Sequence, residues 1–147
     1  MKKMTKFFIK FAIRLLPLAY MGLIWYLSSH PSDAVVNTGW IYDRTLKEAL
    51  HLIEFGILYL LVVLALLSWG KLSQKSSFQA AAFSFLYGLT DELHQYFVPS
   101  RSCSLLDLTK DLIGVAAAWY LIKRAHSVPD SKIKSLIDYI DRKLFNS

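Results

Sequence analysis

Four long apolar stretches alternate with short polar segments along the chain. They cover residues 7–29, 50–69, 78–97 and 105–122, and together they take up more than half of the sequence. A bilayer has a hydrocarbon core about 30 Å thick, which needs roughly 20 apolar residues per helix. Each stretch therefore predicts a membrane-spanning helix, and the pattern as a whole predicts an all-α fold, an integral membrane bundle of four transmembrane helices.

The last segment, residues 128–145, follows a different pattern. Its apolar residues recur at helical spacing opposite basic residues, and they are Ile133, Leu136, Ile137, Ile140 and Leu144. This spacing predicts a C-terminal amphipathic helix that lies on the cytoplasmic membrane surface or docks against a partner. Because the apolar stretches leave no room for a separate soluble domain, residues 1–147 are predicted to form one membrane domain.

The distribution of charge predicts how the bundle is oriented. The chain is 54% hydrophobic and carries a net charge of +6, with 17 Lys and Arg residues. All but four of these precede or open the first stretch, lie between the second and third, or follow the fourth. By the positive-inside rule, the protein is a multi-pass protein of the cell membrane with both termini in the cytoplasm, and loops 30–49 and 98–104 face outward. The basic residues are thus explained without a nucleic-acid partner.

Ionisable and amide side chains gather near the predicted outer ends of the second, third and fourth helices. An ionisable group within the bilayer costs about 2.5 to 3.5 kcal/mol on insertion scales, so such groups face one another or a wet cleft and mark candidate sites. The predicted ligand-binding residues are His51, Glu54, Asp91, Glu92, His94, Gln95, Arg101, Asp107 and Asp111.

One part of this polar set resembles a known family. Asp91-Glu92-x-His94-Gln95 is followed by Pro99, Arg101-Ser102-x-Ser104 and Asp107, and His51-x-x-Glu54-Phe55 precedes them. These residues resemble the VanZ-like family of small multi-pass membrane proteins, whose best-known member is associated with resistance to the glycopeptide teicoplanin. The chain departs from the family pattern at Ser100, where glycine is frequent, at Asp111, where asparagine is frequent, and at His30, where glutamine is usual.

Three uses of the polar set stay open from the sequence. The groups could act as hydrogen-bonding contacts between helices. They could form an outer-leaflet pocket in which Arg101 holds an anionic group of a membrane lipid, a lipid-linked cell-envelope precursor or a lipoglycopeptide; this agrees best with the teicoplanin resistance that the resemblance implies. They could also form a hydrolase or transferase site for lipid headgroups.

The enzymatic alternative has named candidates. His94 would act as general base, Asp91 or Asp107 would orient it, and the nucleophile would be Ser102, Ser104 or water. No cofactor is predicted, although the histidines and carboxylates are also ligand types for a divalent metal such as zinc. The spacing matches the helical-bundle metal signature only weakly, and the oligomeric state stays undetermined.

Overall fold

The computed structural model describes residues 3–30, 43–99, 101, 104–128 and 131–146, and it does not describe the side chains of 43–48, 50, 51 and 146. The described part is helical and contains no strand, which confirms the all-α class. Its elements are α1 (Lys3–Ser28), α3 (Asp43–Ser68), α4 (Gln74–Tyr96), α5 (Leu105–Ser127), α6 (Lys132–Ile140) and the short π-helix η1 (Asp141–Asn146).

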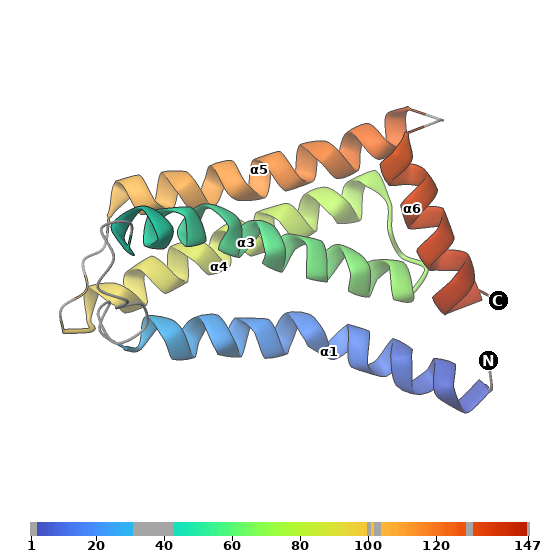
Figure 1. Cartoon of the computed structure of the whole chain (residues 1–147), viewed down its shortest axis with the longest axis horizontal. Coiled ribbons are helices and arrows are strands. Elements are labelled where there is room, and N and C mark those ends of the chain that lie inside the picture. Colours follow the sequence, from blue (N-terminus) through green and yellow to red (C-terminus); the bar gives the residue numbers. More distant parts are fainter. Residues whose placement is uncertain (1–2, 31–42, 100, 102–103, 129–130, 147) are drawn as a thin grey trace.

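The four long helices run alongside one another (Figure 1). Helix α3 contacts α1, α4 and α5, whereas α6 packs across one end of the bundle against α5. Both termini lie at that same end, and the carboxyl end of α4 and the start of α5 lie at the other. Segments that are far apart in the sequence therefore meet at each end of the bundle.

Two helices begin earlier than the apolar pattern predicted. Helix α3 starts at Asp43 rather than near residue 50, because Leu46, Lys47 and Glu48 are good helix formers and extend the helix beyond its apolar part. Helix α4 starts at Gln74 because Ser73 and Ser76 form a reciprocal capping box, in which each side chain accepts a hydrogen bond from the other residue's backbone N–H.

The C-terminal segment differs from the predicted helix over 128–145. Helix α5 continues to Ser127, and α6 begins only at Lys132, where the side chain of Ser131 accepts a hydrogen bond from the N–H of Lys134. Ser131 thus supplies the N-cap, three residues after the predicted start of the helix at residue 128. The predicted loop over 30–49 is also shorter, because α3 already includes residues 43–49.

Glycines set the closest approach between α3 and α5. A Cβ atom on Gly56 would lie 3.0 Å from the carbonyl oxygen of Gly114, and a Cβ atom on Gly114 would collide with the carbonyl oxygen of Leu52. Only residues without side chains let two helix backbones approach this closely. Glu54 lies two residues before Gly56, and Asp111 lies one turn before Gly114. The close contact therefore keeps these two side chains near enough to interact electrostatically.

One described helix, α1, is long and apolar enough to cross a membrane by length and composition. In α3, the shorter segment Leu52–Ser68 is also apolar. Helices α4 and α5 carry more polar residues and do not meet that test within the described part of the chain. The bundle of four spans therefore stays a prediction.

Candidate functional site

Three helices bring four carboxyl groups together near one end of the bundle. Glu54 comes from α3, Asp91 and Glu92 from α4, and Asp111 from α5; these four residues are called the carboxylate cluster below. Asp111 interacts electrostatically with each of the other three. Asp91, Glu92 and Asp111 are 1%, 2% and 0% exposed, so these three lie inside the protein, whereas Glu54 is partly exposed.

Asp91 is held by side chains from α1 and from its own helix. Its Oδ2 atom accepts a hydrogen bond of 2.8 Å from the Ser28 hydroxyl and another of 2.8 Å from the amide nitrogen of Gln95. The Gln95 amide also donates to Ser28 Oγ at 3.3 Å. This closed triangle attaches the last turn of α1 to the last two turns of α4.

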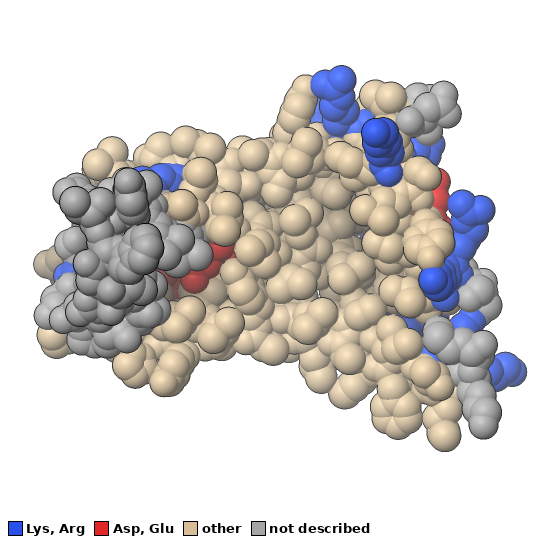
Figure 2. All heavy atoms as spheres, in the orientation of Figure 1, with Lys and Arg blue, Asp and Glu red and all other residues tan. Residues whose placement is uncertain are grey.

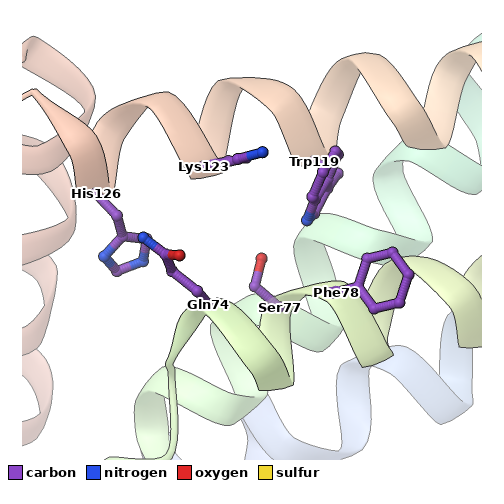
Figure 3. Close-up of a pocket in the computed structure, with 6 residues that line it drawn as sticks. All are labelled: Gln74, Ser77, Phe78, Trp119, Lys123 and His126. Carbon is purple, nitrogen blue, oxygen red and sulfur yellow. The ribbon is translucent and has the colours of Figure 1, made fainter.

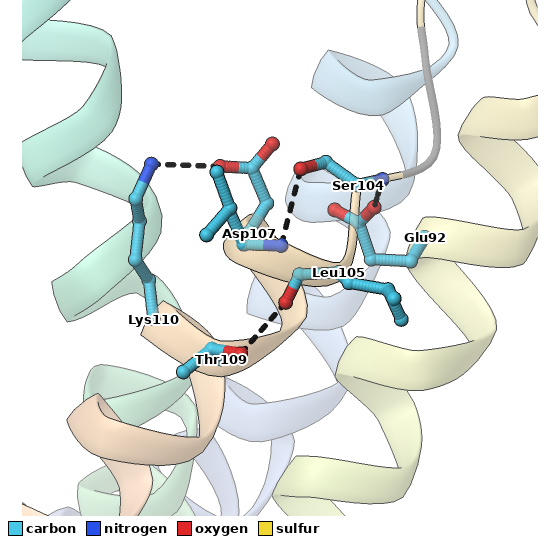
Figure 4. A network of polar contacts seen from close by, with 7 residues as sticks. Glu92, Ser104, Leu105, Asp107, Thr109 and Lys110 are labelled. Carbon is cyan, nitrogen blue, oxygen red and sulfur yellow. Dashed lines mark hydrogen bonds and ion pairs between the residues drawn. The ribbon is translucent and has the colours of Figure 1, made fainter.

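Glu92 lies at the amino-terminal end of α5. Its Oε2 atom accepts a hydrogen bond of 3.0 Å from the backbone N–H of Ser104, the N-cap residue of that helix (Figure 4). Unpaired N–H groups and the helix dipole make a helix N-terminus favourable for negative charge. The start of α5 thus supplies a hydrogen-bond donor to the buried side chain of Glu92.

Asp111 has no such support among the described residues. Neither Oδ1 nor Oδ2 has a hydrogen-bond partner there, and the side chain is fully buried. It packs beside Gly88, where an added Cβ atom would lie 3.4 Å from Asp111 Oδ2 and 3.4 Å from the ring of Phe55. A buried polar group without a partner costs free energy, and it is rare in folded proteins.

Asp107 belongs to the edge of the site. It forms an ion pair with Lys110 at 2.8 Å, and both side chains remain about a quarter exposed (Figure 4). Lys110 thus offsets the charge of Asp107, as its place three residues later on the same helix face allows. The predicted role of Asp107 in orienting His94 has no support from this pairing.

Arg101 stabilises the end of α1. Its Nε atom donates to the carbonyl oxygen of His30, and its Nη2 atom donates to the carbonyl oxygen of Leu27, both at 2.9 Å. The last carbonyls of a helix lack partners within the helix, so Arg101 acts as a carboxyl-terminal cap from a distant loop. The binding of an anionic ligand group by Arg101 stays a prediction. In the structure, the edge of the guanidinium that carries Nε and Nη2 is occupied by the two carbonyl oxygens.

His94 faces α1 rather than a carboxylate. Its ring stacks on Trp25 with centroids 3.9 Å apart, and Nε2 lies 3.0 Å from Ser29 Oγ. Because the single hydroxyl hydrogen of Ser29 is donated to the carbonyl oxygen of Trp25 at 2.7 Å, Nε2 is left as the donor to Ser29. The contact therefore fixes α4 against α1, and Ser29 is not arranged here as a nucleophile activated by His94.

Two of the candidate site residues, one for ligand binding and one as nucleophile, cannot be placed among the described residues. The side chain of His51 and the whole of Ser102 lie outside the described residues. Among the His, Cys, Asp and Glu side chains that are described, no group of three or more is placed to hold a metal ion.

Sequence reasoning did not assign partners to Ser28, Ser29 and Trp25. These residues lie at the end of the first helix. Because successive helices run in opposite directions, the end of the first helix comes to lie beside the end of the third apolar stretch, and this relation could have predicted their partners.

Arg14 plays the same role at the other end of the bundle as Arg101 does here. Its guanidinium donates to Oγ and to the carbonyl oxygen of Ser68, in the last turn of α3.

Comparison with known proteins gives a family assignment. The model of one family, VanZ/LLP1, matches residues 2–126, which is most of the chain. No curated protein and no solved structure matches it. The match includes α1, α3, α4 and nearly all of α5, and thus every residue of the carboxylate cluster. The chain therefore belongs to the membrane-associated VanZ/LLP1 family, as the resemblance of its central motif predicted.

Proposed function

We propose that this chain is a multi-pass membrane protein that binds a polar group of a membrane lipid or lipid-linked envelope component at the carboxylate cluster. In this proposal α1, α3, α4 and α5 span the bilayer. The cluster faces the outer leaflet, and both termini are cytoplasmic. The observation that carries the proposal is the fully buried carboxylate of Asp111, which has no hydrogen-bond partner among the described residues.

The distribution of side chains on α4 supports membrane embedding. This helix buries its polar residues, including Ser84, Asp91 and Glu92, while Leu86 and Leu93 are 57% and 59% exposed. A helix of a water-soluble protein has the opposite arrangement. The inward polar face also lowers the average hydropathy of α4, so a test based on composition alone would miss a spanning helix of this kind.

The surface of the molecule agrees with this interpretation. In Figure 2, Lys and Arg gather mainly at the end that holds α6 and the termini, and the middle of the visible face carries neither sign of charge. Exposed apolar residues cover α1 as well, among them Phe7, Phe11 and Leu18. Large exposed apolar surfaces mark contact with a membrane or a partner, and the basic end would face the cytoplasm.

The charges of the site favour one class of ligand group. The carboxyl groups of the cluster already repel one another when they are ionised, so a further anion beside them would be unfavourable. The edge of the Arg101 guanidinium that carries Nε and Nη2 is engaged with the end of α1. A group with N–H or O–H donors, such as an amine or a sugar hydroxyl, would instead supply the partners that Asp111 lacks. We therefore propose a donor-bearing group in place of the anionic group that the sequence favoured.

The cellular role that we propose is resistance to teicoplanin-type lipoglycopeptides. It follows from the family resemblance, and a donor-rich molecule anchored at the membrane suits the proposed position of the cluster. An enzymatic role is not proposed, because the described contacts join Asp91 to Ser28 and Gln95 and pair Asp107 with Lys110.

A labelling experiment tests the topology. Cys103 is the single cysteine, and the proposal places it outside, so a membrane-impermeant maleimide should label it in intact cells. In the matched variant C103S/K71C the thiol lies in the turn between α3 and α4, and labelling should require permeabilised cells. Labelling of K71C but not of Cys103 in intact cells would reverse the proposed orientation.

A susceptibility experiment tests the site. Cells producing the wild-type protein, Asp111→Asn or Asp138→Asn are compared for teicoplanin susceptibility, with membrane abundance measured in the same cultures. Asp138 is an exposed acid on α6 at the opposite end, so its variant is a matched control. Protection should be lost in Asp111→Asn and kept in the control. Equal protection by both variants at equal abundance would exclude a functional role for Asp111.

A further inference from the structure

A cavity lies at the end of the bundle opposite to the carboxylate cluster. It has a volume of about 150 Å³ and is lined by Gln74, Ser77 and Phe78 of α4 and by Trp119, Lys123 and His126 of α5. Figure 3 shows the two helices as its walls, with the aromatic rings at one side and His126 and Gln74 at the other. A water molecule takes up about 30 Å³ in the liquid, so the cavity has room for a small polyatomic group.

The polar groups around the cavity include a permanent cation and several groups that can donate hydrogen bonds. The Lys123 ammonium group lies 4.8 Å from the centre of the Trp119 ring and can only donate. The hydroxyls of Ser77 and Tyr59 are 2.7 Å apart. When the Tyr59 hydroxyl donates in this contact, the hydroxyl hydrogen of Ser77 is left for an acceptor in the cavity. None of the six described lining residues is acidic.

Two further features favour an acceptor-rich ligand. The Nε2 atom of His126 is buried and has no hydrogen-bond partner among the described residues, and in the tautomer that carries its hydrogen there it can donate to a ligand. Gln74 is the first residue of α4, and the positive end of that helix dipole therefore borders the cavity. Phe78 and Trp119, with ring centroids 5.9 Å apart, provide an apolar side suited to the base of an acyl chain.

We infer that this cavity binds a phosphate group, held by Lys123 and the neighbouring donors. Lipid phosphates at a membrane interface and free inorganic phosphate share this chemistry. The proposed topology would put the cavity at the cytoplasmic surface, where anionic lipids attract basic residues. The site is independent of the carboxylate cluster, so either proposal can fail without the other.

The test uses the full-length protein in neutral detergent, with its thermal unfolding midpoint measured as ligand is added. Phosphatidylglycerol, a diacylglycerol with the same acyl chains and inorganic phosphate are compared. Phosphatidylglycerol should raise the midpoint of the wild type more than diacylglycerol does. Lys123→Gln should need about tenfold more phosphatidylglycerol for the same rise, as expected when a charge-assisted hydrogen bond is lost.

Two variants separate the cavity from general attraction to a basic protein. Lys123→Arg keeps the charge and should retain the wild-type response. Arg124→Gln removes an exposed charge of the same sign beside the cavity, and it should also retain the response. A response to inorganic phosphate that is lost only in Lys123→Gln would support the same cavity with free phosphate as its ligand. Equal responses of the wild type, Lys123→Gln and Arg124→Gln would overturn the inference.

Discussion

The carbonyl oxygen of Leu52 on α3 occupies the space into which a Cβ atom on Gly114 of α5 would extend. The backbones of the two helices are thus in direct contact at this crossing. The same crossing lies next to Glu54 and Asp111 of the carboxylate cluster. Because Gly114 has no side chain, the two helices can come close enough to bring these residues together.

Gly114→Ala is therefore expected to destabilise the protein. The added methyl group forces α3 and α5 apart, and overpacking of this kind costs about 1 to 3 kcal/mol. The measurement is the unfolding midpoint of the purified protein, together with its abundance in membranes. Gly22→Ala in α1 is the control, since a Cβ atom there meets nothing within 4 Å and alanine favours a helix. Equal midpoints for the two variants would contradict the crossing.

Asp111→Asn is expected to stabilise the ligand-free protein while abolishing its function. The substitution keeps the shape of the side chain and removes a carboxyl group that the rest of the carboxylate cluster repels whenever it is ionised, and for which the described residues supply no hydrogen-bond partner. Functional sites often carry such costs, and relieving one commonly adds about 0.5 to 2 kcal/mol. Thermal unfolding without ligand measures this effect.

Asp107→Asn provides the comparison for Asp111. Asp107 is paired with Lys110 and partly exposed, so its substitution should change stability by less than about 1 kcal/mol. If Asp111→Asn lowers the midpoint and leaves function intact, the carboxylate of Asp111 is a structural contact between helices.

Arg101→Ala is expected to loosen the end of α1. Two part-buried hydrogen bonds from a charged group to the carbonyls of Leu27 and His30 would be lost, at a cost of about 1 to 3 kcal/mol. Arg101→Lys should recover only part of this loss, because an ammonium group lacks the planar fork that reaches both carbonyls. Unfolding midpoints of both variants, with Arg124→Ala as an exposed control, test this role. Wild-type stability with weakened ligand binding would instead support the anion clamp expected from the sequence.

The sequence predicted the helices better than it predicted the partners of their polar residues. Long apolar runs define helices locally, and alternating helix directions bring the ends of α1 and α4 and the start of α5 together. The role of Arg101 was not predictable in this way, because its acceptors lie 71 and 74 residues earlier in the chain. Both acceptors are backbone carbonyls, which every residue type has, so the sequence gives no sign of which residues Arg101 will contact.

The start of α3 was misplaced for a different reason. Hydropathy marks only where the apolar segment begins, and a helix can continue through polar residues that have high helix propensity. The unpartnered state of Asp111 was also hidden from the sequence, because Lys110 beside it points to Asp107 instead.

His94 offers the clearest separation between a structural and a catalytic role. His94→Phe keeps an aromatic ring to stack on Trp25 and removes the nitrogen that contacts Ser29; stacking of this kind contributes about 0.5 to 1.5 kcal/mol. If the ring mainly fixes α4 against α1, His94→Phe should keep membrane abundance and teicoplanin protection, whereas His94→Ala should lose stability. Loss of protection in both variants at normal abundance would show that the imidazole itself is needed, and it would restore the hydrolase or transferase alternative.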